Sequence, residues 1–184
     1  MSQKTKYVVY GALFIAIAVV LGSFLSFYLT ENIKISFAPV IVMFAGSVLG
    51  PLWGAATGGI TDFLSFLIGG KAIGTYFPGM TITMALYGLL AGLLFYRREQ
   101  NGILRISLST LLIQTVCSML LNTFWLSILY GTPYVVLLAT RVPSTYISCA
   151  IYVVVLCVLV KNKSRIVRGI GEPGLLSGAR QATN

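Results

Sequence analysis

The chain has 184 residues, of which 57% are hydrophobic and only 9% are charged. A soluble globular domain carries about 25% charged residues, so this composition excludes an ordinary soluble protein. Apolar runs near the length of about 20 residues that crosses a bilayer recur from Tyr7 to Val160. The sequence therefore predicts a multi-pass membrane protein, and its modest length favours a single helical bundle.

Several kinds of chemistry are excluded as well. The chain has no histidine, which removes Ser-His-Asp and Cys-His catalysis. Its three cysteines lie inside apolar runs and lack the spacing of zinc ligands. The Gly-Gly-Lys at residues 69–71 is followed by Ala72, so it is not an ATP-binding phosphate loop. We therefore expect no enzyme activity, no metal and no cofactor.

Six apolar segments are predicted, and together they give an all-α fold. The second segment is short and contains Pro39, so we expect a short, tilted or partly re-entrant helix there. The polar residues before it, 31–34, are expected to form a loop. We expect residues 1–168 to form one transmembrane domain and residues 169–184 a loose cytoplasmic tail. The segments are Tyr7–Tyr28, Ile35–Leu49, Leu52–Ile68, Met80–Tyr96, Ile103–Tyr130 and Val135–Val160.

The basic residues indicate an orientation. The net charge is +9, but Lys and Arg gather at the ends of the apolar segments, which is typical of membrane topology rather than of nucleic-acid binding. With a cytoplasmic N-terminus, six spans put Arg97, Arg98 and Arg105 on the same side as the cluster from Lys161 to Arg168. Without the short second segment these two clusters would lie on opposite faces. We therefore expect six transmembrane helices with both termini in the cytoplasm.

Asp62 is the one acidic residue inside a long apolar run. A carboxylate in a membrane segment costs roughly 2.5–3.5 kcal/mol or more, so it indicates a functional site. Gly50, Gly54 and Gly58 precede it at steps of four residues, and we expect them to let neighbouring helices pack closely. Close packing does not explain Asp62 itself. A structural ion pair with Arg141 is the simpler alternative to a binding role.

In this topology the non-cytoplasmic half collects polar and aromatic residues from several segments. Aromatic rings can sandwich a planar ring, a carboxylate can accept two N–H donors from an amino-pyrimidine edge, and Arg or Lys can hold carboxylates. The set favours a flat, polar heteroaromatic ligand with an anionic part, although an aromatic belt at the membrane interface would also explain the rings. The predicted substrate-binding residues are Asp62, Lys71, Tyr76, Phe77, Thr81, Asn122, Trp125, Tyr134, Arg141 and Ser144, and residues 71–79 are expected to form a lid.

The motifs in these segments resemble those of a known family. The Ala12-Leu13-x-x-Ala16 pattern is similar to the small-residue motif of the substrate-binding S components of energy-coupling factor (ECF) vitamin transporters. The sequences Gly-Pro-Leu-Trp-Gly with the later Gly and Asp at residues 50–62, Tyr-Phe-Pro-Gly-Met-Thr at 76–81 and Arg-Val-Pro at 141–143 look like its folate-specific branch. The resemblance covers roughly residues 7–162.

The resemblance implies a six-helix protein of the bacterial plasma membrane that binds folate from outside the cell. It implies a complex with one transmembrane coupling subunit and two cytoplasmic ATPases, whose ATP use would topple the bundle and carry the vitamin inward. Ala12 and Ala16 would be the docking surface for the coupling subunit. For the site, the family motifs place Asp62 and Arg141 but do not assign each contact. From the residue types we expect Asp62 or Asn122 to read the pterin edge and Tyr76, Phe77 and Trp125 to contact the ring system. Lys71 and Arg141 are expected to serve the polar ring edge or the glutamate carboxylates.

Other functions stay open from the sequence. Within the same class the vitamin could be riboflavin, thiamine or pantothenate. A second class is a self-sufficient secondary transporter that uses Asp62 as a proton site. A membrane enzyme is disfavoured, because the chain has no histidine and only one carboxylate within its apolar runs.

Overall fold

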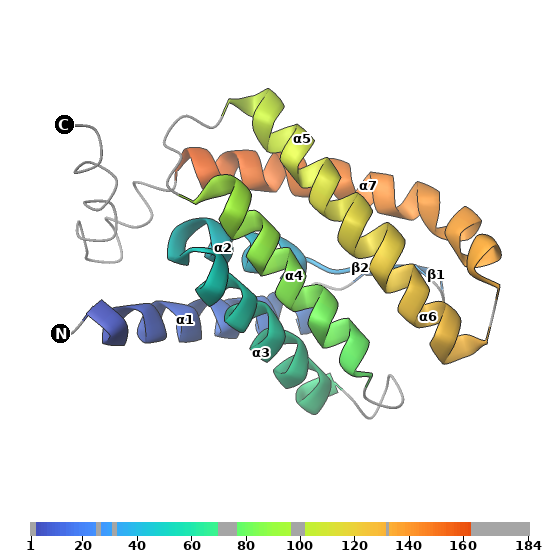
Figure 1. Cartoon of the computed structure of the whole chain (residues 1–184), viewed down its shortest axis with the longest axis horizontal. Coiled ribbons are helices and arrows are strands. Elements are labelled where there is room, and N and C mark those ends of the chain that lie inside the picture. The colour runs from blue at the N-terminus through green and yellow to red at the C-terminus, as the bar shows by residue number, and fades with distance from the viewer. Residues whose placement is uncertain are drawn as a thin grey trace.

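The computed structural model describes residues 3–24, 27–30, 33–69, 77–96, 102–131 and 133–162. These residues form a helical bundle with one small hairpin (Figure 1). Each predicted apolar segment is helical over most of its length. The elements are α1 (Gln3–Phe24), β1 (Phe27–Thr30), β2 (Ile33–Ile35), α2 (Ala38–Leu49), α3 (Pro51–Gly69), α4 (Pro78–Phe95), α5 (Ile103–Gln114), the π-helix η2 (Thr115–Asn122), α6 (Thr123–Tyr130) and α7 (Tyr134–Lys161).

The helices run back and forth between two ends of the bundle. The start of α1, the end of α4, the start of α5 and the end of α7 lie at one end (Figure 1, left). The end of α3, the start of α4, the end of α6 and the start of α7 lie at the other. Lys6, Arg105 and Lys161 occur in the terminal turns at the first end, which we call the basic end. The opposite end, which we call the site end, is where the predicted binding residues of α3, α4, α6 and α7 gather.

The sequence predicted that the first apolar segment, Tyr7–Tyr28, is one helix, and this prediction is wrong at the end of the segment. The helix α1 ends at Phe24, and residues 27–30 and 33–35 form an antiparallel pair, β1 and β2. The strands are rich in aromatic and β-branched residues and are separated by only two residues, which is hairpin spacing. The expected loop at residues 31–34 is therefore partly strand, since Ile33 and Lys34 belong to β2.

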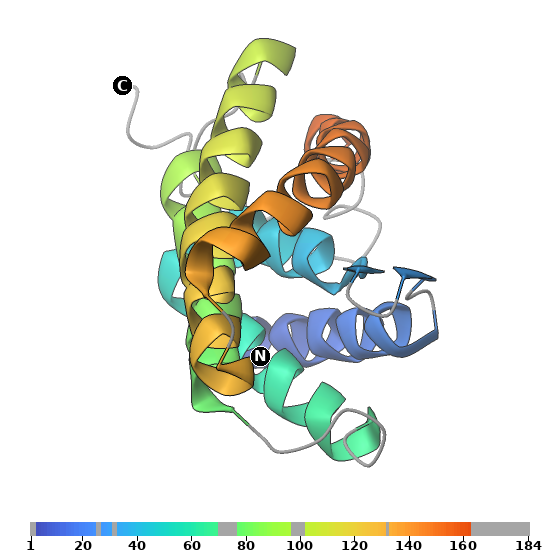
Figure 2. The same cartoon turned by 90° about the vertical axis from the view of Figure 1, so that its right-hand side faces the viewer.

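The short helix α2 is the centre of the bundle. Eleven of its twelve residues are buried, and it packs against α1, α3, α4 and α7. Figure 2 shows it above α1 and below α7, with the hairpin near its start and α4 beside its end. Pro39 lies in its first turn, where a missing N–H does no harm. Its composition is apolar all round because every face meets another helix.

Glycines bring α2, α3 and α4 into backbone contact, as the four-residue spacing predicted. A Cβ placed on Gly54 of α3 would lie 2.6 Å from the Cα of Gly46 on α2 and 2.6 Å from the carbonyl oxygen of Gly88 on α4. Gly58 likewise leaves no room for a Cβ beside the backbone of Met84. Since real Cβ atoms do not approach other atoms this closely, only glycine fits at these crossings. The backbones of α2, α3 and α4 are therefore in direct contact where they cross.

Four of the described helices are long and apolar enough to cross a bilayer, and they occupy Thr5–Ser23, Pro78–Phe95, Ile103–Leu129 and Arg141–Lys161. The shorter α2 is apolar but has only 12 residues. The helix α3 has 19 residues, but Asp62 and its glycines and threonines lower its hydropathy. Large apolar side chains such as Leu104 and Val154 are exposed on the outer surface, as expected for contact with lipid.

The helices α5 and α6 form one rod that is interrupted by the π-helix η2. The Thr123 hydroxyl donates to the carbonyl oxygen of Ser118, five residues earlier, at 3.3 Å. Just before η2, the buried Tyr87 hydroxyl of α4 donates to Oε1 of Gln114 at 2.9 Å. A π segment widens the turn and changes which residues face a neighbour, and such segments are common at functional sites. Here it lies directly before Trp125.

Candidate functional site

Asp62 is held by a side chain from the next helix. The Oγ1 hydroxyl of Thr81, in the first turns of α4, donates to Oδ2 of Asp62 on α3 at 2.7 Å. Both side chains are half-buried near the site end of the bundle. A hydroxyl that donates to a carboxylate is a strong, short hydrogen bond. Thr81 thus supplies part of the stabilisation that a carboxylate in an apolar segment needs.

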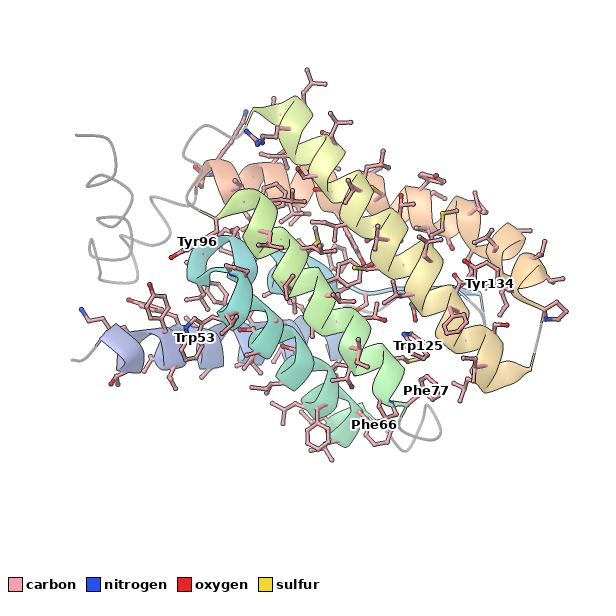
Figure 3. All side chains as sticks on the ribbon, viewed as in Figure 1. Trp53, Phe66, Phe77, Tyr96, Trp125 and Tyr134 are labelled. Atoms are coloured by element: carbon pink, nitrogen blue, oxygen red, sulfur yellow. The ribbon has the colours of Figure 1, made fainter. Side chains whose placement is uncertain are left out.

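Two aromatic rings and a glycine pack together beside this pair. The rings of Phe77 and Trp125 lie 5.6 Å apart between centroids, at 59°. Phe77 directly precedes α4 and Trp125 lies in the first turn of α6, and the two rings lie next to each other (Figure 3). A Cβ on Gly79 would lie 2.8 Å from Cε2 of Trp125, so the indole rests on the backbone of α4. The structure therefore brings together Asp62, Phe77, Thr81 and Trp125, which come from distant parts of the sequence.

Arg141 lies on α7 at the site end, and its Nη1 nitrogen is buried. Below it, Thr145, Ser148 and Tyr152 follow at steps of four, three and four residues and are all buried. This spacing places them on one face of α7. The helix therefore presents a polar stripe to the interior of the bundle, whereas the sequence reasoning singled out only Arg141 and Ser144.

The hydroxyls on α7 are largely bonded within the helix. Ser144 donates to the carbonyl oxygen of Arg141 at 2.9 Å, and Ser148 donates to that of Ser144 at 2.8 Å. Pro143 lies inside the helix and has no N–H to donate to the carbonyl of Ala139, so one backbone hydrogen bond of α7 is missing at this point. Ser144 is half-buried and its role as a substrate contact stays a prediction.

The remaining predicted site residues fall in different places. Asn122 ends η2 and is half-buried, one turn before Trp125. Tyr134 opens α7 and lines an open hollow together with Leu120, Leu121 and Phe124 (Figure 3). Lys71 and Tyr76 lie outside the described residues. The predicted lid also loses its last part, because Pro78 and Gly79 belong to the first turn of α4.

Sequence reasoning missed two polar contacts that join separate elements inside the bundle. Tyr87 bonds Gln114 between α4 and α5, and the Tyr152 hydroxyl donates to the carbonyl oxygen of Ser36, just after the hairpin, at 2.5 Å. Gln114 is a polar residue inside an apolar run, and this was the signal that could have indicated it. Tyr152 gave no such signal, since a tyrosine in a membrane helix can also belong to the aromatic belt at the membrane interface.

The predicted docking residues lie on the outside of the bundle. Ala12 and Ala16 are both exposed on α1, next to the exposed apolar residues Leu13, Ile17 and Val20. Small residues on an exposed helix face allow another helix to approach closely. A second subunit could therefore pack against Ala12 and Ala16. The opposite face of α1 already packs against α2 and α3 of the same chain.

These features define a class of protein before any comparison is made: a helical membrane bundle with a carboxylate, an arginine and aromatic rings at one end. Among the described residues, no group of three or more His, Cys, Asp or Glu side chains is placed to hold a metal ion. The family model described as "ECF transporter, substrate-specific component" matches residues 6–160. The chain belongs to this family, and the resemblance seen in its motifs is confirmed.

Within this family the chain is similar to proteins named as folate transporters. The chain is 31% identical over 154 residues to the folate transporter FolT of Clostridium novyi, which covers 84% of this chain and 87% of the relative. It is 28% identical over 107 residues to FolT of Leuconostoc mesenteroides, covering 57% of this chain and 56% of that protein. Among solved structures it is similar to the crystal structure of FolT bound with folic acid, with a TM-score of 0.76, 30% identity, and coverage of 86% of this chain and 94% of that one.

Proposed function

We propose that this chain binds folate at the outer face of the cell membrane and is the substrate-specific subunit of an ATP-driven ECF transporter. The observation that carries the proposal is the likeness of nearly the whole bundle to FolT with folic acid bound. Folate combines a flat, amino-bearing heteroaromatic ring with carboxylates. The site end offers a carboxylate, an arginine and packed aromatic rings, which match those groups in kind.

Within this proposal the residues have distinct roles. Asp62 accepts N–H donors from the pterin edge, with Asn122 as the other candidate for that contact. Phe77 and Trp125 cover the ring, joined by Tyr76 and Tyr134. Thr81 holds the carboxylate of Asp62 through the bond of 2.7 Å. Arg141, with Lys71 and Ser144, serves the polar ring edge or the glutamate carboxylates.

The proposal includes an assembly. ATP would be used by two cytoplasmic ATPases, joined to the chain through a transmembrane coupling subunit that docks on Ala12 and Ala16. The exposed position of both alanines supports this role. The chain would cross a bacterial plasma membrane six times, as one domain over residues 1–168, with both termini and the tail 169–184 in the cytoplasm. The gathering of Lys6, Arg105 and Lys161 at one end of the bundle supports that orientation.

Measurement of vitamin binding by the purified chain tests whether folate is its substrate. Trp125 lies in the proposed site, while Trp53 stacks on Tyr7 at the basic end, with ring centroids 5.8 Å apart. We expect saturable quenching of tryptophan fluorescence by folate, and the same quenching in a Trp53→Phe variant. Riboflavin, thiamine and pantothenate serve as the comparison. Tight quenching by one of these vitamins, with none by folate, would end the folate assignment.

Transport in liposomes tests the energy source. The chain alone should give no uptake of folate, either with ATP or with a pH gradient. Addition of the coupling subunit and the two ATPases should give ATP-dependent uptake. If the chain alone takes up folate along a pH gradient and Asp62→Asn abolishes that uptake, the protein is a secondary transporter and not an S component.

A further inference from the structure

The indole N–H of Trp125 is a buried hydrogen-bond donor that has no acceptor among the described residues. Most buried polar groups in proteins are paired, so an unpaired one calls for a physical explanation. The hydroxyls of Thr61 and Thr110 are also buried and unpaired there. A threonine hydroxyl can rotate toward a carbonyl of its own helix, whereas the indole N–H has one direction, which is set by the ring. Trp125 is therefore the donor whose orientation matters.

The ring of Trp125 is held in place on three sides. Phe77 packs against it at 5.6 Å between centroids, and Phe124 meets it edge-on at 5.3 Å. Gly79 brings the backbone of α4 against it, since a Cβ there would lie 2.8 Å from Cε2 of the indole. A ring packed in this way cannot turn to find another acceptor. The donor is preorganised, and it is positioned by the start of α4.

The same part of α4 also positions the carboxylate. Gly79 supports the indole of Trp125, and Thr81, two residues later, donates to Asp62 at 2.7 Å. The first turn of α4 thus positions both the N–H donor of Trp125 on α6 and the carboxylate acceptor of Asp62 on α3. A heteroaromatic ring of the pterin type carries both kinds of partner, with N–H groups on one edge and ring nitrogens and a carbonyl oxygen as acceptors. Simple ring stacking would not require the buried N–H.

We propose that Trp125 is a specificity-determining residue, which donates its indole N–H to an acceptor atom of the heteroaromatic ring of the substrate. The inference rests on the proposed function, because it takes the site end as the vitamin-binding site. It goes further in assigning a hydrogen bond, rather than ring contact alone, to this residue. Discrimination then depends on the acceptor, since a ligand without it leaves the donor buried and unpaired.

The test replaces the N–H and keeps the ring. In Trp125→benzothienylalanine, sulfur stands in place of the indole N–H and the bicyclic shape is retained. We expect folate binding, measured by isothermal titration calorimetry, to weaken by about 3- to 10-fold, the range for loss of one neutral hydrogen bond. Trp125→Phe should weaken it at least as much. Trp53→Phe, at the basic end, is the matched control and should bind as the unmodified chain does.

Each outcome decides the proposal. If the benzothienylalanine variant binds folate as tightly as the unmodified chain, the N–H is not used and the inference is wrong, even if Trp125→Phe binds weakly. Pteroic acid, which lacks the glutamate, should show the same deficit as folic acid; a deficit with folic acid alone would put the acceptor in the tail and overturn the ring assignment. Absence of folate binding by the unmodified chain is a separate result, which contradicts the proposed function instead.

Discussion

The Thr81 hydroxyl donates to Oδ2 of Asp62 at 2.7 Å and so joins α3 and α4 at the end of the bundle where the aromatic rings also gather. Deeper in the bundle the same two helices meet at Gly54 and Gly88, where their backbones are in contact. The glycine contact fixes the distance between the two helices, and the hydrogen bond fixes the orientation of the Asp62 carboxylate. Asp62 is therefore a side chain with a set direction.

Removal of the Thr81 hydroxyl should weaken substrate binding without unfolding the protein. Thr81→Val keeps the shape and loses the donor, so the carboxylate of Asp62 is no longer oriented. Hydrogen bonds to charged groups contribute about 1.5–3 kcal/mol, and we expect folate affinity to fall at least about 10-fold. Thr81→Ser keeps a hydroxyl and should restore most of the affinity. Titration calorimetry of the three proteins measures the effect.

A double-mutant cycle separates positioning from direct contact. If Thr81 acts through Asp62, the effect of Thr81→Val should largely disappear in an Asp62→Asn background. Equal effects of Thr81→Val in both backgrounds would show that Thr81 does not act through the carboxylate. Thermal unfolding of each variant, followed in parallel, separates loss of affinity from loss of fold.

The glycine contact predicts a stability effect of a single methyl group. Gly54→Ala would place a Cβ 2.6 Å from backbone atoms of both Gly46 and Gly88, and neither can move aside. Overpacking of this kind costs about 1–3 kcal/mol, so the unfolding temperature should fall clearly. Gly11→Ala is the matched control, because its Cβ would meet only the Thr57 hydroxyl at 3.9 Å, an ordinary contact. It should leave the unfolding temperature unchanged or slightly higher. A similar loss in both variants would refute the close-packing explanation.

The effects of substituting Tyr87 and Gln114 on stability should be coupled, because the two side chains share a buried hydrogen bond. Tyr87→Phe leaves Oε1 of Gln114 without its donor at 2.9 Å, and Gln114→Leu removes the acceptor. Each single change should lower the free energy of unfolding by about 0.6–2 kcal/mol, the range for side-chain hydrogen bonds inside membranes. The double variant should lose less than the sum of the two. Strict additivity, measured by unfolding in mixed micelles, would mean that the bond contributes nothing.

Docking on α1 predicts loss of transport with binding intact. Ala12→Trp and Ala16→Trp each put a large ring on an exposed helix face, so they should prevent close approach of the coupling subunit. Copurification with that subunit and ATP-driven uptake should both be lost. The folate affinity of the chain alone should change by no more than about twofold. Ala150→Trp, on the exposed side of α7, is the control and should retain both activities. Equal loss of binding in the α1 variants would contradict a docking role.

The sequence by itself determined the helical segments, and it singled out Asp62 as the first candidate for a binding residue. Apolar length is a local property, so the segments from Leu52 to Val160 are helices to within a few residues of the predicted ends. Asp62 stood out because a lone carboxylate in an apolar run is costly whatever surrounds it. The spacing of the glycines indicated a close helix contact, and Gly54 and Gly58 make one.

Tertiary structure decided the partners. The sequence could not pair Thr81 with Asp62 rather than with another residue, because that bond depends on how α3 and α4 pass each other. The polar stripe of α7 is buried only because the rest of the bundle covers that face. The ring of Trp125 is placed by Phe77 and by the backbone at Gly79, which belong to a different part of the chain. Segment identity follows from local hydrophobicity, whereas the geometry of the site follows from contacts between residues far apart in the chain.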